Sequence, residues 1–198
     1  MTRLILVRHG ETDWNRARRI QGSTDIPLND TGRAQARDTA LRLRDEVDPE
    51  TVRLVSSDLS RARETAEIIG AELGLDGPRT YPELRERGYG DAEGETDVVF
   101  AERWGPWPTA QVPNAESRED VRARALRGLT RVVSDARSES APGESTVIVV
   151  AHGALIREVI GHASEDAFPI PGERLANGSV HHLRWEGDRI RLLSYAAG

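Results

Sequence analysis

The feature that most constrains the fold is a pair of aliphatic runs, each of which ends in the dipeptide His-Gly. The first run, residues 4–7, leads into Arg8-His9-Gly10, and the second, residues 147–151, leads into His152-Gly153. A continuous run of Val, Ile and Leu predicts a strand buried on both faces, as in a parallel sheet covered by helices. Because α/β proteins place their chemistry at the carboxyl ends of such strands, we expect His9 and His152 to meet at one site. For either histidine alone, the simpler interpretation is a strand-end residue bonded to nearby backbone.

Length and composition predict one soluble domain. The chain of 198 residues is long enough to bury a stable core without disulfides or metal ions, and we expect a single domain over residues 1–198. It has no cysteine, which excludes disulfides, thiolate zinc sites and cysteine nucleophiles. No apolar stretch approaches the roughly 18 residues of a membrane span, and the first aliphatic run leads straight into Arg8-His9, unlike a signal peptide. We therefore expect a cytoplasmic protein with no membrane contact.

The charge of the chain argues against a nucleic-acid partner. Its formal net charge is -6, although all 27 of its basic residues are arginine. Any anion site must therefore be built from arginine, whose planar fork suits phosphate and carboxylate oxygens.

The order of apolar segments predicts a three-layer α/β/α sandwich around a mostly parallel central sheet. Strands are expected at 4–7, 53–56, 147–151, 179–185 and 189–195, with the last two joined as a hairpin. Helices are expected at 31–47 with Thr31 as N-cap, at 58–73 with Ser57 or Asp58 as N-cap and Gly74 as stop, at 117–137 with a capping box at Ser117, and at 154–162. Residues 138–144 are expected to form a polar loop.

The segment 81–116 is expected to form a small cap over the site. After Tyr81 its pattern loosens into Gly, Pro, Trp and acidic residues, with a short helix near 97–104. Trp104 and Trp107 lie in the Pro-rich part of this cap, where they either pack the cap or contact the substrate. The sequence leaves both interpretations open.

Arginines near the two histidines supply the charges for an anion site. Arg8 precedes His9, and Arg61 lies in the first turn of the helix expected after Ser57, where free backbone N–H groups favour an anion. Two guanidinium groups, two imidazoles and a helix N-terminus would form a pocket for a phosphoryl group without a metal. In the alternative interpretation, Arg61 and Arg63 are solvated surface charges.

The motifs of the chain, taken together, resemble those of the histidine phosphatase superfamily, also called phosphoglycerate mutase-like. They occur in that family's order and cover nearly the whole chain. The matching segments are Leu6-Val7-Arg8-His9-Gly10-Glu11-Thr12, Asp13-Trp14-Asn15, Gln21-Gly22, Pro27-Leu28-Asn29-Asp30-Thr31-Gly32, residues 56–66, Leu84-Arg85-Glu86 with Gly90 and Glu93-Gly94, and Ala151-His152-Gly153.

The resemblance implies a phosphoryl-transfer site that uses no metal and no cofactor. His9 would be the nucleophile and would carry the phosphoryl group as a phosphohistidine, most easily if its other ring nitrogen donates to a backbone carbonyl. Arg8, Arg61 and His152 would stabilise the charge of the transition state. The implied phosphate-binding set is Arg8, Asn15, Gln21, Gly22, Arg61, His152 and Gly153.

The resemblance also implies a carboxyl group that gives a proton to the leaving group. The match to the pattern Leu-x-Glu-x-x-x-Gly-x-x-Glu-Gly assigns this catalytic role to Glu86, with Glu83 as the near competitor. In a further alternative, Glu86 forms a surface ion pair with a neighbouring arginine. His181 and His182 are successive residues of an expected strand, so they point to opposite faces and are interpreted as structural.

Three functions are compatible with these residues. The favoured one is a metal-independent phosphatase, a phosphoric monoester hydrolase acting on a small phosphorylated metabolite. The alternative is a cofactor-dependent phosphoglycerate mutase, but residues 95–116 contain one basic residue, Arg103, to retain a doubly charged intermediate. The third is a catalytically silent binding or regulatory protein, which is disfavoured because all the catalytic groups are present. A homodimer formed through an exposed sheet edge or the tryptophan loop is compatible with the sequence.

Overall fold

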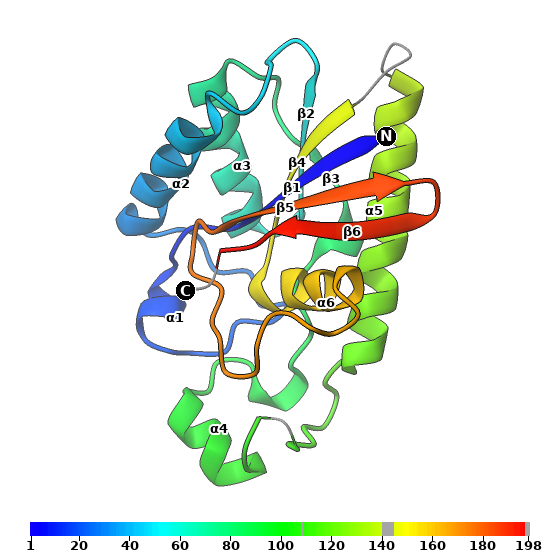
Figure 1. Cartoon of the computed structure of the whole chain (residues 1–198). Coiled ribbons are helices and arrows are strands. Elements are labelled where there is room, and N and C mark those ends of the chain that lie inside the picture. The colour runs from blue at the N-terminus through cyan, green and yellow to red at the C-terminus, as the bar shows by residue number, and fades with distance from the viewer. Residues whose placement is uncertain (108, 140–144, 197–198) are drawn as a thin grey trace.

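A computed structural model of the chain describes residues 1–107, 109–139 and 145–196, in which strands alternate with helices (Figure 1). The strands are β1 (Thr2–Arg8), β2 (Val52–Ser56), β3 (Arg79–Thr80), β4 (Ser145–Ala151), β5 (Val180–Glu186) and β6 (Arg189–Ser194). The helices are α1 (Asp13–Arg16), α2 (Asp30–Leu43), α3 (Ser60–Leu73), α4 (Asp97–Trp104), α5 (Arg118–Glu139) and α6 (Gly153–Ala163), with 3-10 turns at Pro82–Leu84 and Gly90–Ala92.

The strands form a six-stranded sheet in the order β3-β2-β4-β1-β5-β6. β1 and β4 are parallel neighbours, with Val7 opposite Val150 and Arg8 opposite Ala151. β2 and β3 continue the parallel part on one side, whereas the hairpin β5–β6 is antiparallel on the other. This arrangement confirms the mostly parallel sheet, and it brings the carboxyl ends of β1 and β4 to the same edge.

Residues 4–7 of β1 are all aliphatic because both faces of this strand are buried. Leu4 and Leu6 belong to a core with residues of α5 and α6, whereas Ile5 and Val7 belong to a second core with residues of α2 and α3. Successive side chains of a strand point to opposite faces, and all four of these are 0% exposed. The sheet is therefore the middle layer of three, with α2 and α3 on one face and α5 and α6 on the other (Figure 1).

The start of α2 differs from the predicted one. Its N-cap is Asn29, whose side-chain oxygen accepts a hydrogen bond from the N–H of Gly32, so the prediction of Thr31 was wrong by two residues. Asn29 is the better cap because its side chain also donates to Glu11 and so is fixed in place. The helix ends at Leu43, which leaves residues 44–47 of the predicted helix outside it.

The start of α3 is fixed from a distant loop. Neither Ser57 nor Asp58 is its N-cap: that residue is Leu59, and the carboxylate of Asp25 accepts from the backbone N–H of Ser60 at 2.8 Å. Asp58 binds the guanidinium of Arg85 instead. The predicted end of the helix is confirmed, because Gly74 adopts the left-handed conformation that a helix C-terminus favours.

The long helix α5 begins where the sequence predicts but ends later. The hydroxyl of Ser117 accepts from the N–H of Asp120 at 3.0 Å, as a capping residue does. The helix continues to Glu139, so the predicted loop does not begin at residue 138. The remainder of that loop, residues 140–144, lies outside the described residues.

Part of the segment 81–116 lies at the end of the molecule that carries α4 (Figure 1), where Phe100 forms a small core with Ile20 and Ala92. Phe100 is 1% exposed, and the ring of Trp107 stacks on it with 3.8 Å between ring centroids. Trp104 lies against the same ring at 5.5 Å. These contacts support the packing interpretation of both tryptophans, whereas the neighbouring Pro108 lies outside the described residues.

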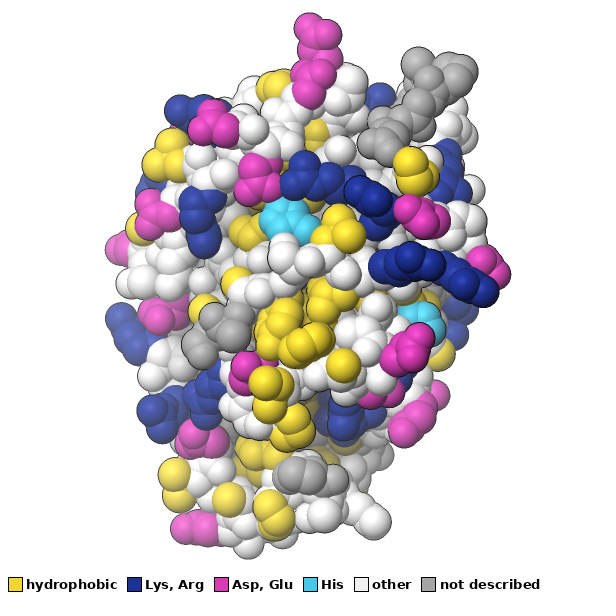
Figure 2. Space-filling model, in the orientation of Figure 1, with side chains coloured by type: hydrophobic (Ala, Val, Ile, Leu, Met, Phe, Trp, Pro, Cys, Tyr) yellow, Lys and Arg dark blue, Asp and Glu magenta, His cyan; other side chains and the backbone are white. Residues whose placement is uncertain are grey.

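The face that carries β5, β6 and the segment after α6 is apolar in its middle and surrounded by charges of both signs (Figure 2). Large apolar side chains that are exposed in these elements are Phe168, Ile170 and Leu193. Among the helices of the described ranges, none combines the length and the apolar character that crossing a bilayer requires.

Candidate active site

The two histidines that end the aliphatic strands meet, as the sequence predicts. The N–H of His9 donates to the carbonyl of Ala151 at 3.0 Å, which ties the end of β1 to the end of β4. The imidazole rings of His9 and His152 have centroids 5.2 Å apart, and the two residues are 2% and 0% exposed. The parallel register therefore places both rings in one buried site.

The ring of His9 is held in one tautomer. Its Nδ1 lies 2.7 Å from the carbonyl oxygen of Gly10, and because a carbonyl can only accept, Nδ1 must be the donor. Nε2 of the neutral ring then carries the free electron pair. The N–H of Gly10 in turn donates to the hydroxyl of Thr65, which donates to the carbonyl of Arg61. Gly10 must be a glycine, because a Cβ there would lie 2.3 Å from the backbone oxygen of Gly32.

Two arginines flank the histidines. Arg61, in the first turn of α3, is 0% exposed and donates to the carbonyls of Thr24 and Gly22 at 2.9 and 2.8 Å. Arg8, at the end of β1, donates to the carbonyl of Leu175. Burial lowers the pKa of both guanidinium groups, because a charged group loses its hydration there. The surface interpretation was wrong for Arg61, whereas Arg63 is half exposed and pairs with Glu67.

Both imidazoles are neutral at neutral pH. Burial lowers the pKa of His9 and of His152 well below the usual value. The positive charges of Arg61 and Arg8 lower both pKa values further, which also shows that the four groups lie together. A neutral His9 keeps the electron pair of Nε2 available for attack.

Four buried nitrogen atoms of this site have no hydrogen-bond partner among the described residues. They are Nε of Arg8, Nε of Arg61 and both ring nitrogens of His152. A buried polar group left without a partner costs about 1–3 kcal/mol. Three side chains with such atoms around one nucleophilic imidazole form a site that an anion with several oxygens would complete.

Glu86 lies at the N-terminus of α6, the helix that begins directly after His152. Its carboxylate accepts from the backbone N–H groups of Ala154 and Leu155 at 3.1 Å and of Arg87 at 2.9 Å. A helix N-terminus favours an acidic group, because its first N–H groups lack partners within the helix. Glu86 is therefore held at the edge of the histidine site by backbone N–H groups, and it has no ion pair with a described residue.

Glu83, the competing carboxyl group, faces the other way. It lies against α5, where its Oε1 is 3.2 Å from the guanidinium of Arg131. A Cβ added at Gly128 of α5 would lie only 2.8 Å from the Cβ of Glu83. The 3-10 turn Pro82–Leu84 therefore packs tightly on α5. The geometry therefore places Glu86 and not Glu83 beside the histidines.

The remaining predicted binding residues surround the same site. The side-chain oxygens of Asn15 and Gln21 lie 3.1 and 3.0 Å from the hydroxyl of Thr12, whose single proton is donated to one of them at a time. The carbonyl of Gly22 holds Arg61, and a Cβ at Gly153 would lie 3.3 Å from Nε of Arg8. Within the described part of the chain, no cluster of His, Asp or Glu is arranged to hold a metal ion.

Glu93 is a residue whose structural importance the sequence only hinted at, through its place in the Glu-Gly motif. Its carboxylate accepts from the backbone N–H groups of Ser23, Thr24 and Tyr89 and from the hydroxyls of Ser23 and Thr24. The carbonyls of this same loop hold Arg61. Glu93 therefore fixes the loop that fixes the guanidinium of Arg61.

Asn177 is a second contact that no motif pointed to. Its side-chain nitrogen donates to the carbonyl of His9 at 2.9 Å and to the side-chain oxygen of Asn15 at 3.3 Å. It lies in the connection between α6 and β5, which has no periodic pattern to read. An Asn next to a Gly in such a connection predicts a turn, and nothing local shows where its side chain points.

The other histidines lie outside the site. His181 and His182 point to opposite faces of β5, as predicted: His181 is fully buried, whereas His182 lies between Arg3 and Glu46. His162 is exposed near the end of α6.

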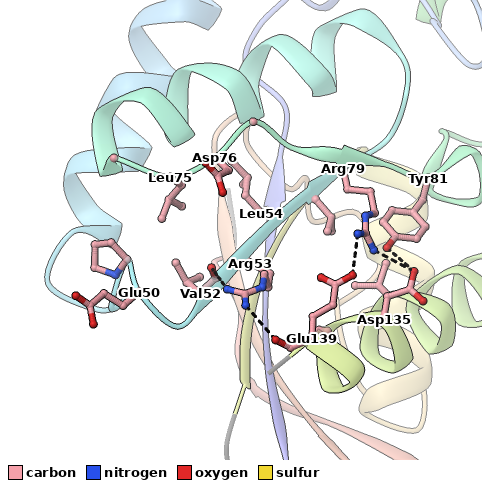
Figure 3. A pocket seen from close by; sticks show the side chains of 16 residues that line it. Glu50, Val52, Arg53, Leu54, Leu75, Asp76, Arg79, Tyr81, Asp135 and Glu139 are labelled. Atoms are coloured by element: carbon pink, nitrogen blue, oxygen red, sulfur yellow. Dashed lines mark hydrogen bonds and ion pairs between the residues drawn. The ribbon is translucent and has the colours of Figure 1, made fainter. Parts of the chain in front are cut away.

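A hollow of about 470 Å³ lies beside β2 and is separate from the histidine site. Figure 3 shows Arg79, Tyr81, Asp135 and Glu139 turned toward one another at its wall. Arg79 lies 2.8 Å from Glu139, and the hydroxyl of Tyr81 donates to Asp135 at 2.8 Å. These charges satisfy one another, in contrast to the unpartnered nitrogens around His9.

Comparison with known proteins agrees with this geometry. Residues 4–198 match the family described as the histidine phosphatase superfamily, branch 1. The chain is 37% identical over 198 residues to the uncharacterized phosphatase PhoE of Bacillus subtilis, with 98% of this chain and 94% of that protein covered. It is 31% identical to a metal-independent phosphoserine phosphatase of Arabidopsis thaliana, with 93% and 77% covered. Other relatives are named as probable phosphoglycerate mutases.

Solved structures show the same fold. A mycobacterial glucosyl-3-phosphoglycerate phosphatase in complex with VO3 superposes with a TM-score of 0.83 at 31% identity, and 99% of each chain is covered. The chain belongs to branch 1 of the histidine phosphatase superfamily and is a phosphoric monoester hydrolase.

Proposed function

We propose that this protein hydrolyses small-molecule phosphate monoesters through a phosphohistidine on Nε2 of His9, without a metal ion. The observation that carries the proposal is the set of unpartnered nitrogens of Arg8, Arg61 and His152 around a neutral His9. A phosphoryl group offers several oxygen acceptors to these donors at once, and its negative charge balances two buried guanidinium groups.

In the first step, the electron pair of His9 Nε2 attacks phosphorus. A phosphorus–nitrogen bond forms, the phosphorus–oxygen bond of the ester breaks, and the leaving alkoxide takes a proton from the carboxyl group of Glu86. The carbonyl of Gly10, 2.7 Å from Nδ1, stabilises the positive charge that develops on the ring. Arg8 and Arg61 stabilise the charge on the phosphoryl oxygens, as preorganised cations do in other phosphoryl transfers.

In the second step, water attacks the phosphohistidine. The carboxylate of Glu86 accepts a proton from the water, a new phosphorus–oxygen bond forms, and the phosphorus–nitrogen bond breaks. Inorganic phosphate leaves, and His9 and Glu86 return to their first states. The assignment is supported by the contacts of Glu86 with the backbone N–H groups of Ala154 and Leu155, which closely follow His152 in the chain.

The single basic residue of the segment 95–116 favours hydrolysis over mutase activity. A mutase must retain a doubly phosphorylated intermediate, which requires cations in the cap. The one basic residue of this segment, Arg103, lies 2.7 Å from the carboxylate of Glu95 and over the ring of Trp104. It is neutralised within the cap, and the complete catalytic set also disfavours a silent binding protein.

The test is phosphate release from p-nitrophenyl phosphate and glycerol 3-phosphate after dialysis against a chelator, with phosphoglycerate isomerisation assayed beside it. We expect hydrolysis without metal, and a phosphorylated protein, stable in alkali and labile in acid, after a rapid quench. The variant His9→Ala should lose the phosphorylated form and at least about 10⁴-fold in kcat. The control His162→Ala should retain both. Loss of activity on chelation, or a phosphorylated His9→Ala variant, contradicts the proposal.

A further inference from the structure

The peptide group between His9 and Gly10 is held by two side chains, one on each of its polar atoms. Its carbonyl, that of His9, accepts from the side-chain nitrogen of Asn177 at 2.9 Å. Its N–H, that of Gly10, donates to the hydroxyl of Thr65 at 3.0 Å. Asn177 lies in the connection between α6 and β5, and Thr65 lies in α3, so two distant segments of the chain meet on this one group.

The chemistry of the groups fixes the direction of both bonds. A carbonyl can only accept, so the atom of Asn177 that lies beside the carbonyl of His9 must be the amide nitrogen. The hydroxyl of Thr65 has one proton, which it donates to the carbonyl of Arg61 at 2.7 Å, so this hydroxyl is the acceptor for the N–H of Gly10. Thr65 is 0% exposed, so bulk water does not compete for these bonds.

This peptide group matters because the next carbonyl orients the nucleophile. Nδ1 of His9 donates to the carbonyl of Gly10 at 2.7 Å. A glycine has no Cβ to restrict its backbone, so this carbonyl can turn unless the peptide group before it is fixed. The N–H of His9 is already bonded to Ala151 of β4. Fixing the peptide group between His9 and Gly10 therefore fixes the backbone on both sides of the imidazole, and with it the direction of Nε2.

Both side chains also contact a residue of the predicted phosphate-binding set. Thr65 bonds the backbone of Arg61, and Asn177 donates to the side-chain oxygen of Asn15 at 3.3 Å. The same two residues therefore relate the attacking nitrogen to groups that would hold the phosphoryl group. Phosphoryl transfer depends on this relation, because a displacement of about 1 Å can lower a rate about 10²-fold.

We propose that Thr65 and Asn177 are positioning residues that together clamp the peptide group between His9 and Gly10 and so direct Nε2 of His9 toward phosphorus. They act through this peptide group and not by contact with the substrate. The inference rests on the phosphatase activity proposed above, to whose phosphohistidine step it adds two residues.

The first test compares Thr65→Val, which removes the hydroxyl but keeps the branched shape, with Thr65→Ser, which keeps the hydroxyl. A rapid quench with p-nitrophenyl phosphate, with the enzyme in excess, measures how fast His9 is phosphorylated. We expect Thr65→Val to lower this rate about 10–10²-fold and Thr65→Ser to keep it within about threefold. The Ki of inorganic phosphate should change less than about threefold in both, because Arg61 keeps its bonds to the carbonyls of Thr24 and Gly22. A general loss of structure would weaken phosphate binding as well.

Thr130→Val is the matched control. The hydroxyl of Thr130 donates to the carbonyl of Leu126 at 2.8 Å, which is the same bond to the residue four positions earlier that Thr65 makes with Arg61. Thr130 lies on the exposed surface of α5, away from the clamped peptide group. This variant should keep both the phosphorylation rate and the Ki.

The second test removes the other half of the clamp. Asn177→Ala should lower the phosphorylation rate about tenfold or more. The double variant with Thr65→Val should be about as slow as the slower single variant, because releasing either atom frees the same peptide group. An unchanged rate in Asn177→Ala, or a double variant whose loss is the product of the two single losses, overturns the clamp. Asn177 is partly exposed, so its variant decides the proposal even if Thr65→Val does not fold. If the unaltered protein forms no phosphohistidine, the proposed function fails, and the clamp fails with it.

Discussion

His152 and His181 are two wholly buried histidines on either side of β1, and their surroundings differ in kind. His152 follows β4, and His181 lies in β5, opposite Leu6 of β1. Both are 0% exposed. Both ring nitrogens of His181 are bonded, to the hydroxyl of Ser179 at 2.9 Å and to the N–H of Ala196 at 3.2 Å. Neither ring nitrogen of His152 has a partner in the described structure.

The hydrogen bonds of the ring nitrogens distinguish a structural buried histidine from a functional one. Burial lowers the pKa of both, so titration alone does not separate them. Both ring nitrogens of His181 are bonded within the protein, whereas those of His152 lie beside two other side chains with unpartnered nitrogens, Arg8 and Arg61. His181 therefore belongs to the scaffold, and His152 belongs to the phosphoryl site.

The largest expected effect is the difference in kcat between variants in which each histidine is removed separately. We expect His152→Ala to lower kcat for p-nitrophenyl phosphate by about 10²–10³-fold, as the loss of a charge-stabilising donor does. Its free energy of unfolding, measured in urea, should fall only by the effect of the cavity, since no hydrogen bond is lost. His181→Ala is the control and should keep kcat within about twofold. Similar kcat values for both variants would contradict the division of roles.

The second test follows the stability contributed by His181 as a function of pH. Burial lowers its pKa from 6.5 to about 4, so between these values the unfolded chain binds a proton that the folded protein excludes. Its contribution is present in full above pH 6.5 and is lost as the pH falls toward 4, a change of about 3 kcal/mol. The destabilisation caused by His181→Ala should therefore be greatest at pH 7 and shrink toward pH 4 in urea titrations. A penalty independent of pH would show that His181 is not held neutral.

The smallest expected effect on kcat concerns Glu93, which acts on the site through the loop that holds Arg61. Glu93→Gln keeps the size of a carboxylate but offers one oxygen to the donors of the loop 23–24, so Arg61 should lose its fixed position. We expect kcat to fall about tenfold, with less change in KM, because a loosened cation stabilises the transition state less well. The control is Glu64→Gln, which removes a surface partner of Arg33. Equal kcat values for the two variants would assign Glu93 to stability alone.

Much of the fold and of the reacting groups could be predicted because their signals are local. A run such as residues 147–151 has no polar face, which predicts a strand buried on both sides. Two such strands paired in parallel must end at the same edge, which brings His9 to His152. Glu86 could be assigned through the resemblance of its segment to the family's motif, and the structure places it beside the histidines.

The contacts that the sequence did not show join residues far apart in the chain. Asp25 rather than Asp58 caps α3, Glu93 holds residues 23–24, and Asn177 donates to the carbonyl of His9. No hydrophobic period or motif around these side chains indicates which residue each one contacts. Glu83 and Glu86 are residues of the same type, but Glu83 pairs with Arg131 of α5, whereas Glu86 accepts from the first N–H groups of α6.

The sequence by itself determined the layers of the molecule and the residues that bring chemistry to its edge, because hydrophobic periodicity and motif spacing are local properties of the chain. The tertiary structure decided which of those polar groups are satisfied by the protein and which are left open. The reason is physical: a hydrogen-bond partner is a matter of position in space, and only packing brings a distant carbonyl to Arg61 while leaving the ring nitrogens of His152 without one.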